Sequence, residues 1–148
     1  MIVVDASVAV KWLVPEHGSD EADRLLSSSS KLFAPELIRV EVAAALTRRF
    51  RTGQAPEAEV REDCARWPQM LAAGILILTP VEHDYQQAID LAVRLKHPLQ
   101  DCLYLALAER LQAPLVTADP KFIQRSTGLY PAVQPLTAFA ASASKKPH

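Results

Sequence analysis

The stretch PLQDCLYLALAERLQAPLVTADP, residues 98–120, contains a helix, a strand and the start of a second helix. Residues 98–112 are rich in leucine and alanine and begin at a proline, which predicts a helix. LVT, residues 115–117, predicts a short buried strand, and a further helix is expected over residues 120–125. Strands that alternate with helices in this way favour a mainly parallel sheet with helices on both faces.

The rest of the chain repeats this alternation. Strands are predicted at residues 2–4, 31–34, 75–78 and 132–136. Helices are predicted at residues 7–13, from a serine cap at Ser19 to the serine run 27–30, from Pro35 to Gly53, from Pro56 with a kink or break at Pro68, and at residues 82–96. We therefore expect an α/β fold, a three-layer α/β/α domain over residues 1–140, followed by a disordered tail, residues 141–148.

Composition sets broad limits on function. The chain has 148 residues, 49% apolar and 22% charged, with a net charge of −1, so its overall charge gives no sign of nucleic-acid binding and leaves only a local basic patch open. Cys64 and Cys102 show no metal-ligand spacing, which favours a reduced protein. The apolar residues at the N-terminus are too few for a signal segment or membrane span. We expect a soluble, cytoplasmic protein without a membrane partner.

Three aspartates lie where strands give way to helices or where a helix begins. Asp5 follows the first strand, Asp119 follows LVT, and Asp101 falls in the first turn after Pro98. Parallel sheets carry their active sites at the carboxyl ends of the strands, where Asp5 and Asp119 are expected. Helix capping and a favourable interaction with the helix dipole are the structural alternatives for all three.

Glu41 is harder to explain structurally. In LIRVEVAAAL, residues 37–46, it lies on a helix face formed by Leu37, Ile38 and alanines, well inside the predicted helix. An unpaired buried carboxylate is strongly unfavourable. One alternative is an ion pair with Arg48, about 10 Å away along the helix axis; another is a peripheral helix whose alanine face is partly exposed. A third is that the glutamate faces a metal pocket.

The four acids, Asp5, Glu41, Asp101 and Asp119, would repel one another at one sheet edge unless their pKa values rise or a cation binds. Oxygen ligands without thiolates suit Mg²⁺ or Mn²⁺, which can activate water for attack on a phosphodiester. The hydroxyls of Ser7 and Thr117, each two residues from an aspartate, could orient a carboxylate or a metal-bound water. Ordinary turn or capping roles are the alternative for both.

Four motifs together resemble PIN-domain ribonucleases, and are most similar to VapC-type toxins of toxin–antitoxin pairs. They are VVDASVAV at residues 3–10, APELIRVEVAAAL at 34–46, LQDCLYLALAERL at 99–111 and LVTADPKF at 115–122. The resemblance implies a parallel sheet between helices and an endoribonuclease dependent on Mg²⁺ or Mn²⁺ that hydrolyses RNA as a toxin. It also implies a homodimer and an inhibitory cognate antitoxin.

In this resemblance the family's four acids fall on Asp5, Glu41, Asp101 and Asp119, and its small hydroxyl residues on Ser7 and Thr117. The sequence departs from the pattern in two places, since Gln100 stands where an aromatic residue is common and Pro120 follows the last acid. Neither departure removes a ligand.

Other functional predictions concern basic, imidazole and indole groups. Lys11 and Arg48 could contact RNA phosphates, although solvated surface is their alternative. His83 and His97 show no partner spacing typical of a ligand or a catalytic base, and the two tryptophans are expected in the core or at a dimer contact: Trp12, Trp67.

The competing functions differ in the residues they require. A haloacid-dehalogenase-type phosphatase needs an aspartate where Ser7 stands. A receiver domain needs an acidic pair just before its phosphorylated aspartate and a lysine that follows a late strand, and this pattern is not present. A catalytically inactive PIN-like binding module and a PIN nuclease outside toxin–antitoxin systems both stay open.

Overall fold

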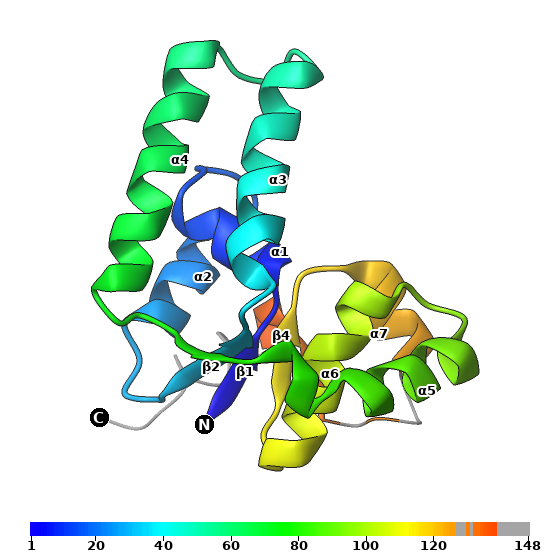
Figure 1. Ribbon diagram of the computed structural model, residues 1–148. Helices are drawn as coiled ribbons and strands as arrows, with labels where there is room; N and C mark the ends of the chain where they lie inside the picture. Colours follow the sequence, from blue (N-terminus) through cyan, green and yellow to red (C-terminus); the bar gives the residue numbers. More distant parts are fainter. Residues whose placement is uncertain (127–129, 131, 139–148) are drawn as a thin grey trace.

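A computed structural model describes residues 1–126, 130 and 132–138 of the chain (Figure 1). The predicted tail, residues 141–148, and the end of the predicted domain, residues 139–140, lie outside the described residues. At the centre is a five-stranded sheet in the order β3-β2-β1-β4-β5, and each neighbouring pair of strands is parallel. Its strands are β1 (Ile2–Val4), β2 (Leu32–Pro35), β3 (Ile77–Thr79), β4 (Leu115–Thr117) and β5 (Val133–Pro135).

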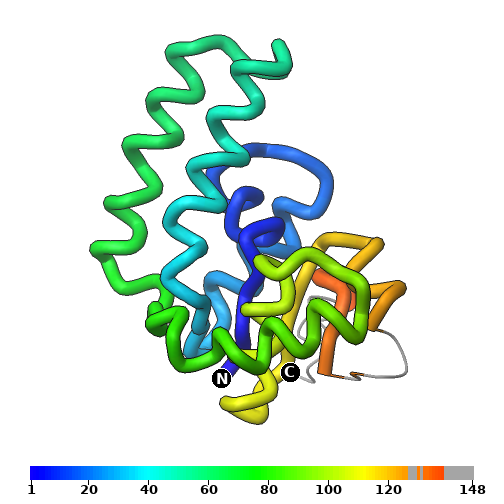
Figure 2. The backbone as a smooth tube through the Cα atoms, turned by 45° about the vertical axis from the view of Figure 1, so that its right-hand side comes forward, coloured from blue at the N-terminus to red at the C-terminus, as the bar shows by residue number. Residues whose placement is uncertain are grey.

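Helices cover both faces of the sheet, as predicted (Figures 1 and 2). Parallel crossovers are right-handed. The connections leading from β1 to β3 therefore lie on one face, and those from β3 to β5 on the other. The first set comprises α1 (Ala6–Ala9), the 3₁₀ turn η1 (Val10–Trp12), α2 (Ser19–Leu26), α3 (Ile38–Arg51) and α4 (Glu57–Ala72); the second comprises the 3₁₀ turn η2 (Val81–His83), α5 (Tyr85–Leu95), α6 (Leu99–Leu111) and α7 (Pro120–Ser126). The α3–α4 pair rises away from the sheet (Figure 1).

This topology places β1 beside both β2 and β4, so the chain leaves β1 and β4 in opposite directions across the sheet. Such a switch point opens a crevice at the carboxyl ends of the two strands. Those ends point upward in Figure 1, toward α1 and the first turn of α3. Asp5 follows β1 and Asp119 follows β4 by two residues, so the fold brings both to this crevice.

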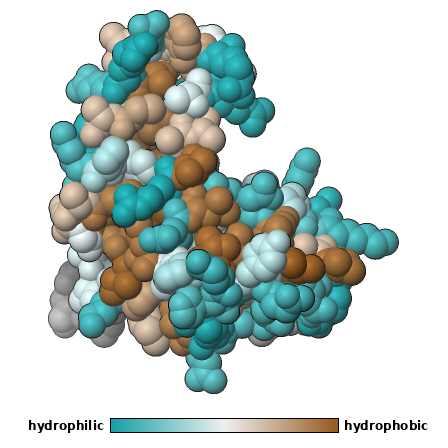
Figure 3. All heavy atoms as spheres, viewed as in Figure 1, coloured by the Kyte–Doolittle hydropathy of each residue, from teal (hydrophilic) through white to brown (hydrophobic). Residues whose placement is uncertain are grey.

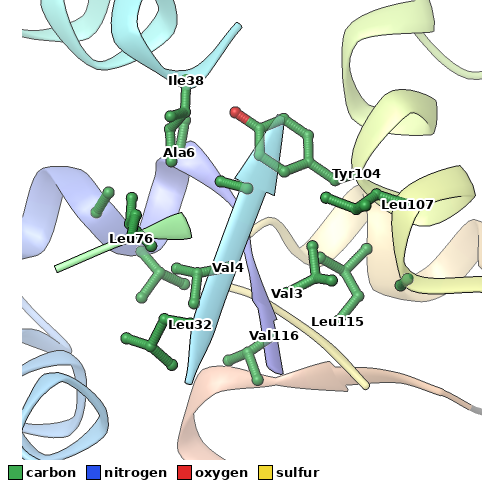
Figure 4. Packing of buried hydrophobic residues seen from close by; sticks show 14 of the residues in the cluster. Val3, Val4, Ala6, Leu32, Ile38, Leu76, Tyr104, Leu107, Leu115 and Val116 are labelled. Atoms are coloured by element: carbon green, nitrogen blue, oxygen red, sulfur yellow. The ribbon is translucent and has the colours of Figure 1, made fainter. Parts of the chain in front are cut away.

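The core explains why these segments form a sheet between helices. Strands β1 and β4 are buried along their whole length, and α6 is buried continuously from Cys102 to Ala108 as it packs on the sheet (Figure 4). Trp12 and Trp67 are also buried, so both lie in the core rather than on an exposed surface. Cys64 and Cys102 are free thiols. None of the helices in the described residues is long and apolar enough to span a membrane.

Two local predictions were wrong, and one of the two alternatives at Pro68 is excluded. Pro35 ends β2, where it pairs with Thr79, and α3 begins only at Ile38. Ser19 does not cap α2: Gly18 occupies the cap position with a φ of 90°, and the Ser19 hydroxyl donates instead to the Val14 carbonyl. Of the predicted kink or break at Pro68, the break does not occur, because α4 continues through this residue as one helix.

Candidate active site

The four predicted acids line one pocket of about 190 Å³ at the switch point of the sheet. Asp5 comes from the end of β1, Glu41 from α3, Asp101 from α6 and Asp119 from the turn after β4. The other described lining residues are small or apolar side chains and one hydroxyl: Ala6, Ser7, Val10 and Ala45. The described lining thus contains four carboxyl groups and no basic side chain.

Asp5 is buried and held at both carboxylate oxygens. Its Oδ1 accepts a hydrogen bond from the Ser7 backbone N–H at 2.9 Å, which makes it the N-cap of α1. Its Oδ2 accepts one from the Thr117 hydroxyl at 2.7 Å, which ties β1 to β4. Burial raises the pKa of Asp5 to about 6, against the lowering effect of these two hydrogen bonds, and the charges of Asp101 and Asp119 raise it further.

The two predicted hydroxyl residues orient the protein groups around Asp5. Because the Thr117 hydroxyl donates to Asp5, its oxygen is free to accept the backbone N–H of Asp119 at 3.1 Å. Ser7 Oγ accepts the Ala118 N–H at 3.0 Å and lies 3.4 Å from Thr117 Oγ1. Ser7 and Thr117 therefore fix the turn that carries Asp119, and Thr117 also holds a carboxylate directly.

Glu41 lies in the first turn of α3, so the prediction that it is well inside its helix was wrong. Its Oε1 accepts a hydrogen bond from the hydroxyl of Tyr104 at 2.7 Å. Burial raises the pKa of Glu41 to about 7, and the negative charges of Asp5 and Asp101 add to this effect. In the described part of the chain Arg48 is exposed and makes no ion pair with Glu41.

The alanine face next to Glu41 leaves space for the pocket. Ala45 is half-buried and lines it, while Ala44 is exposed. The alternative of a peripheral helix with a partly exposed alanine face holds only for the alanines, because α3 also buries Ile38, Val42 and Leu46. The small side chains keep this part of α3 open to the pocket.

Asp101 and Asp119 lie close together in the pocket, with one carboxylate oxygen of each within 4.8 Å of the other. Asp101 Oδ2 lies 2.6 Å from His97 Nε2, and burial raises the pKa of Asp101, against the lowering effect of His97. Asp119 Oδ1 accepts the backbone N–H groups of Lys121 at 3.0 Å and Phe122 at 3.4 Å, so it caps α7. The capping alternative is therefore correct for Asp5 and Asp119 as geometry, and it leaves both carboxylates in the pocket.

Two residues of the site were missed by the sequence reasoning. The prediction that His97 shows no partner spacing typical of a ligand or a catalytic base overlooked Asp101, which lies four residues after His97 and contacts it. One ligand atom from each of His97, Asp101 and Asp119 lies within 4.8 Å of the others. Tyr104, three residues after Asp101 on α6, carries the only hydroxyl in the run LYLALA and reaches Glu41. Both residues lie three or four positions from Asp101, a spacing at which side chains on a helix share a face, and this was the signal available in the sequence.

The two predicted RNA contacts lie outside the acidic pocket. Lys11 forms an ion pair with Glu16 at 3.2 Å and donates to the His17 carbonyl at 2.7 Å. It lines a separate hollow of about 220 Å³, whose lining also includes Thr117, which donates to Asp5, and Pro120, which follows Asp119. A role for Lys11 or Arg48 in RNA binding stays a prediction.

The donor set fits a hard divalent cation. Two of the four carboxyl groups, Asp5 and Glu41, have pKa values raised to about 6 and about 7, which shows how poorly the protein alone compensates their charge. All four carboxyl groups provide oxygen ligands. The imidazole of His97 contacts Asp101 and is not part of the pocket lining. Mg²⁺ and Mn²⁺ prefer such oxygen ligands.

Comparison with known proteins identifies the family. The sequence matches the PIN domain over residues 2–127. The chain belongs to the PIN-domain family. Ribonuclease VapC3 of Pyrobaculum aerophilum is 30% identical to this PIN domain over 133 residues, which cover 86% of this chain and 96% of the relative. A VapC ribonuclease of Mycobacterium bovis is 30% identical over 119 residues, covering 80% of this chain and 86% of the relative. These relatives place this PIN domain among the VapC-type ribonucleases.

Solved structures agree with this assignment of the fold. VapC20 of Mycobacterium tuberculosis, a toxin that cleaves the sarcin-ricin loop, has a TM-score of 0.67 at 17% identity, covering 91% of this chain and 100% of that one. A chain of a toxin–antitoxin complex from Klebsiella pneumoniae has a TM-score of 0.66 at 15% identity, covering 92% of this chain and 98% of that one. The predicted PIN-like α/β fold is confirmed.

Proposed function

We propose that this VapC-type PIN domain is an endoribonuclease that requires Mg²⁺ or Mn²⁺ and acts as the toxin of a toxin–antitoxin pair. The observation that carries the proposal is the pocket in which Asp5, Glu41, Asp101 and Asp119 meet without a basic side chain in its described lining. Names of the relatives, all VapC ribonucleases, support the reaction class.

Asp5, Glu41, Asp101 and Asp119 are the residues that would hold the cation. When bound, Mg²⁺ or Mn²⁺ supplies activation of water and stabilisation of charge on the phosphodiester. Thr117 and the Ser7 N–H hold the Asp5 carboxylate in one orientation before any ligand arrives. Burial raises the pKa of Glu41 to about 7 in the metal-free protein, so a cation that binds this carboxylate near neutral pH would displace a proton.

The test is cleavage of a labelled single-stranded RNA by purified protein in Mg²⁺, in Mn²⁺ and in chelator. We expect cleavage with either cation and none in chelator. Asp5→Asn and Asp101→Asn should abolish cleavage and leave the circular dichroism spectrum unchanged. Asp20→Asn, at an exposed position on α2, is the matched control and should cleave like the wild type.

Wild-type cleavage rates in either pocket variant would contradict the assignment of these ligands. RNA binding without cleavage by the wild type would instead favour a catalytically inactive binding module.

The partners are part of the proposal. A homodimer is supported by the large apolar side chains that stay exposed on the monomer: Met1, Val40, Phe50, Ile77, Tyr85 and Val93. Figure 3 shows hydrophobic residues gathered where the α3–α4 pair meets the rest of the molecule. Light scattering of the purified protein should give twice the monomer mass of 16.3 kDa. An inhibitory antitoxin and a cytoplasmic location complete the proposed role.

A further inference from the structure

His97 lies between α6 and α7, behind the acidic pocket. Its Nε2 lies 2.6 Å from Asp101 Oδ2, and its Nδ1 lies 3.0 Å from Nη1 of Arg125. The ring stacks on Phe122, with ring centroids 4.7 Å apart and an angle of 15° between the planes. Only 3% of the side chain is exposed. The imidazole is therefore held by contacts at both nitrogens and on one ring face.

These contacts determine where the imidazole proton lies. A guanidinium group can only donate hydrogen bonds, so Nδ1 of His97 must accept from Arg125. In the neutral ring the hydrogen then lies on Nε2, which donates it to Asp101 Oδ2. Nε2 has no free electron pair in this arrangement. His97 is consequently a donor to the carboxylate and not itself a metal ligand, although its nitrogen lies near the oxygens of Asp101 and Asp119.

The same contacts connect the two acids on this side of the pocket. Phe122 and Arg125 belong to α7, the helix that Asp119 caps. Arg125 Nη1 also donates to the Lys96 carbonyl at 2.9 Å, which fixes the segment just before α6. Movement of α7 would therefore be transmitted through His97 to Asp101.

We propose that His97 is a positioning residue: through its Nε2–H it fixes Asp101 on α6 relative to Asp119 at the start of α7, and Arg125 sets the tautomer that makes this possible. The proposal rests on the proposed metal-dependent function. His97 engages only Oδ2 of Asp101 within the described structure, which leaves Oδ1 available to a cation. Removal of a group that orients a metal ligand in this way typically lowers metal affinity about 10- to 100-fold.

The first test reads the tautomer directly. Long-range ¹H–¹⁵N correlation spectra of the wild type in alkaline buffer, where imidazoles are neutral, should show His97 with its hydrogen on Nε2. The same tautomer should persist when Mg²⁺ is added. A hydrogen on Nδ1 would leave Nε2 unable to donate to Asp101, and a Mg²⁺-induced change of Nε2 typical of coordination would make His97 a ligand. Either result would overturn the proposal.

The second test compares substitutions by calorimetric titration with Mn²⁺ alone. His97→Phe keeps an aromatic ring against Phe122 but removes both hydrogen bonds, and it should weaken Mn²⁺ binding about 10- to 100-fold. His97→Gln restores an N–H donor near the Nε2 position and should recover most of the affinity. The control His83→Phe, at an exposed histidine on η2, should bind like the wild type.

The outcomes separate this proposal from the proposed function. Wild-type affinity in His97→Phe, or equal loss in His97→Phe and His97→Gln, would overturn the positioning role while leaving the metal site intact. If the wild type itself binds no Mn²⁺, the metal-dependent function fails and the positioning role with it. Should His97→Phe not fold, the tautomer measurement and the affinity of His97→Gln still decide.

Discussion

Asp5 and Glu41 are two buried or half-buried carboxyl groups whose ionised forms are only partly stabilised by hydrogen bonds. Asp5 receives hydrogen bonds at both oxygens, whereas Glu41 receives one, from Tyr104. Burial nevertheless raises the pKa of both carboxyls, to about 6 and about 7. Hydrogen bonds to the ionised form thus do not fully offset the loss of hydration. The metal-free pocket is therefore a place where neutralising one acid should stabilise the fold.

Glu41→Gln should raise the Tm of the protein in chelator at slightly alkaline pH by a few degrees. Glutamine removes the charge and keeps an oxygen that can accept the Tyr104 hydrogen bond. The free energy of unfolding should rise by roughly 1 to 2 kcal/mol, a figure reduced to allow for the exposed part of the side chain. Thermal unfolding of both proteins across a Mg²⁺ series at constant ionic strength is the measurement.

Magnesium should stabilise the wild type more than Glu41→Gln, because it binds the folded state through the carboxylate. A variant that is destabilised in chelator, and shifted by Mg²⁺ as much as the wild type, would show that Glu41 is no ligand.

The same two carboxyls predict a pH dependence of stability. Their folded-state pKa values lie above the ordinary values of 3.8 and 4.5, so between these and about 6 to 7 the folded state binds more protons than the unfolded state. Stability in chelator should therefore fall as pH rises through this window. Chemical unfolding at several pH values measures this slope, and saturating Mg²⁺ should flatten or reverse it. If stability in chelator instead rises with pH through this window, the pKa values of Asp5 and Glu41 are not raised in the folded state.

At the scale of elements, strand ends and helix starts combine two roles in one side chain. Asp5 caps α1 and Asp119 caps α7, and both carboxyl groups line the pocket. Because each helix begins immediately after a strand at the same sheet edge, the capping residue is placed at the site by the fold itself. Capping and cation binding are thus not exclusive, and a substitution can separate them.

Asp119→Ser should separate them. Serine is a good N-cap, so stability in chelator should stay within about 0.5 kcal/mol of the wild type or rise. Asp119→Ala, which loses the cap, should lower stability by about 1 kcal/mol. Both variants should lose RNA cleavage, because neither offers a carboxylate. Chemical unfolding and the RNA assay provide the measurements, and wild-type cleavage by Asp119→Ser would reduce Asp119 to a cap.

The elements that sequence predicted well depend on local patterns. Strand, acid and helix start are adjacent in the chain for Asp5 and Asp119, so the sequence alone indicated their place. The start of α3 was misplaced because Pro35 pairs with Thr79 of β3, which no local pattern reveals. Likewise Tyr104 reaches Glu41 across 63 positions, and Arg125 reaches His97 across 28. Side-chain partners distant in sequence required the structure.

At the scale of the whole molecule, strand order decides where the chemistry lies. The sequence predicted a parallel sheet but not its order, since pairing of short buried strands is not specified by their own residues. With β1 placed between β2 and β4, the first and the last acids meet at one crevice, and α3 and α6 add the other two from opposite sides. The site is a property of the complete fold.

Expression of this PIN domain alone in a growing bacterium should arrest growth, and Asp5→Asn should not. The physical reason is that Asp5 is the most buried of the pocket acids, and asparagine can keep both of its contacts. The amide oxygen can accept from the Ser7 N–H and the amide nitrogen can donate to the Thr117 hydroxyl, so the variant should fold but lack a ligand charge. Growth curves, protein levels and sequencing of RNA ends after brief induction are the measurements, with Asp20→Asn as the toxic control. Co-expression of a small protein encoded in a neighbouring reading frame should restore growth if that protein is the antitoxin. Equal toxicity of Asp5→Asn would show that the growth arrest does not come from nuclease activity. If the wild type cleaves RNA but leaves growth unchanged, this PIN domain lies outside toxin–antitoxin systems.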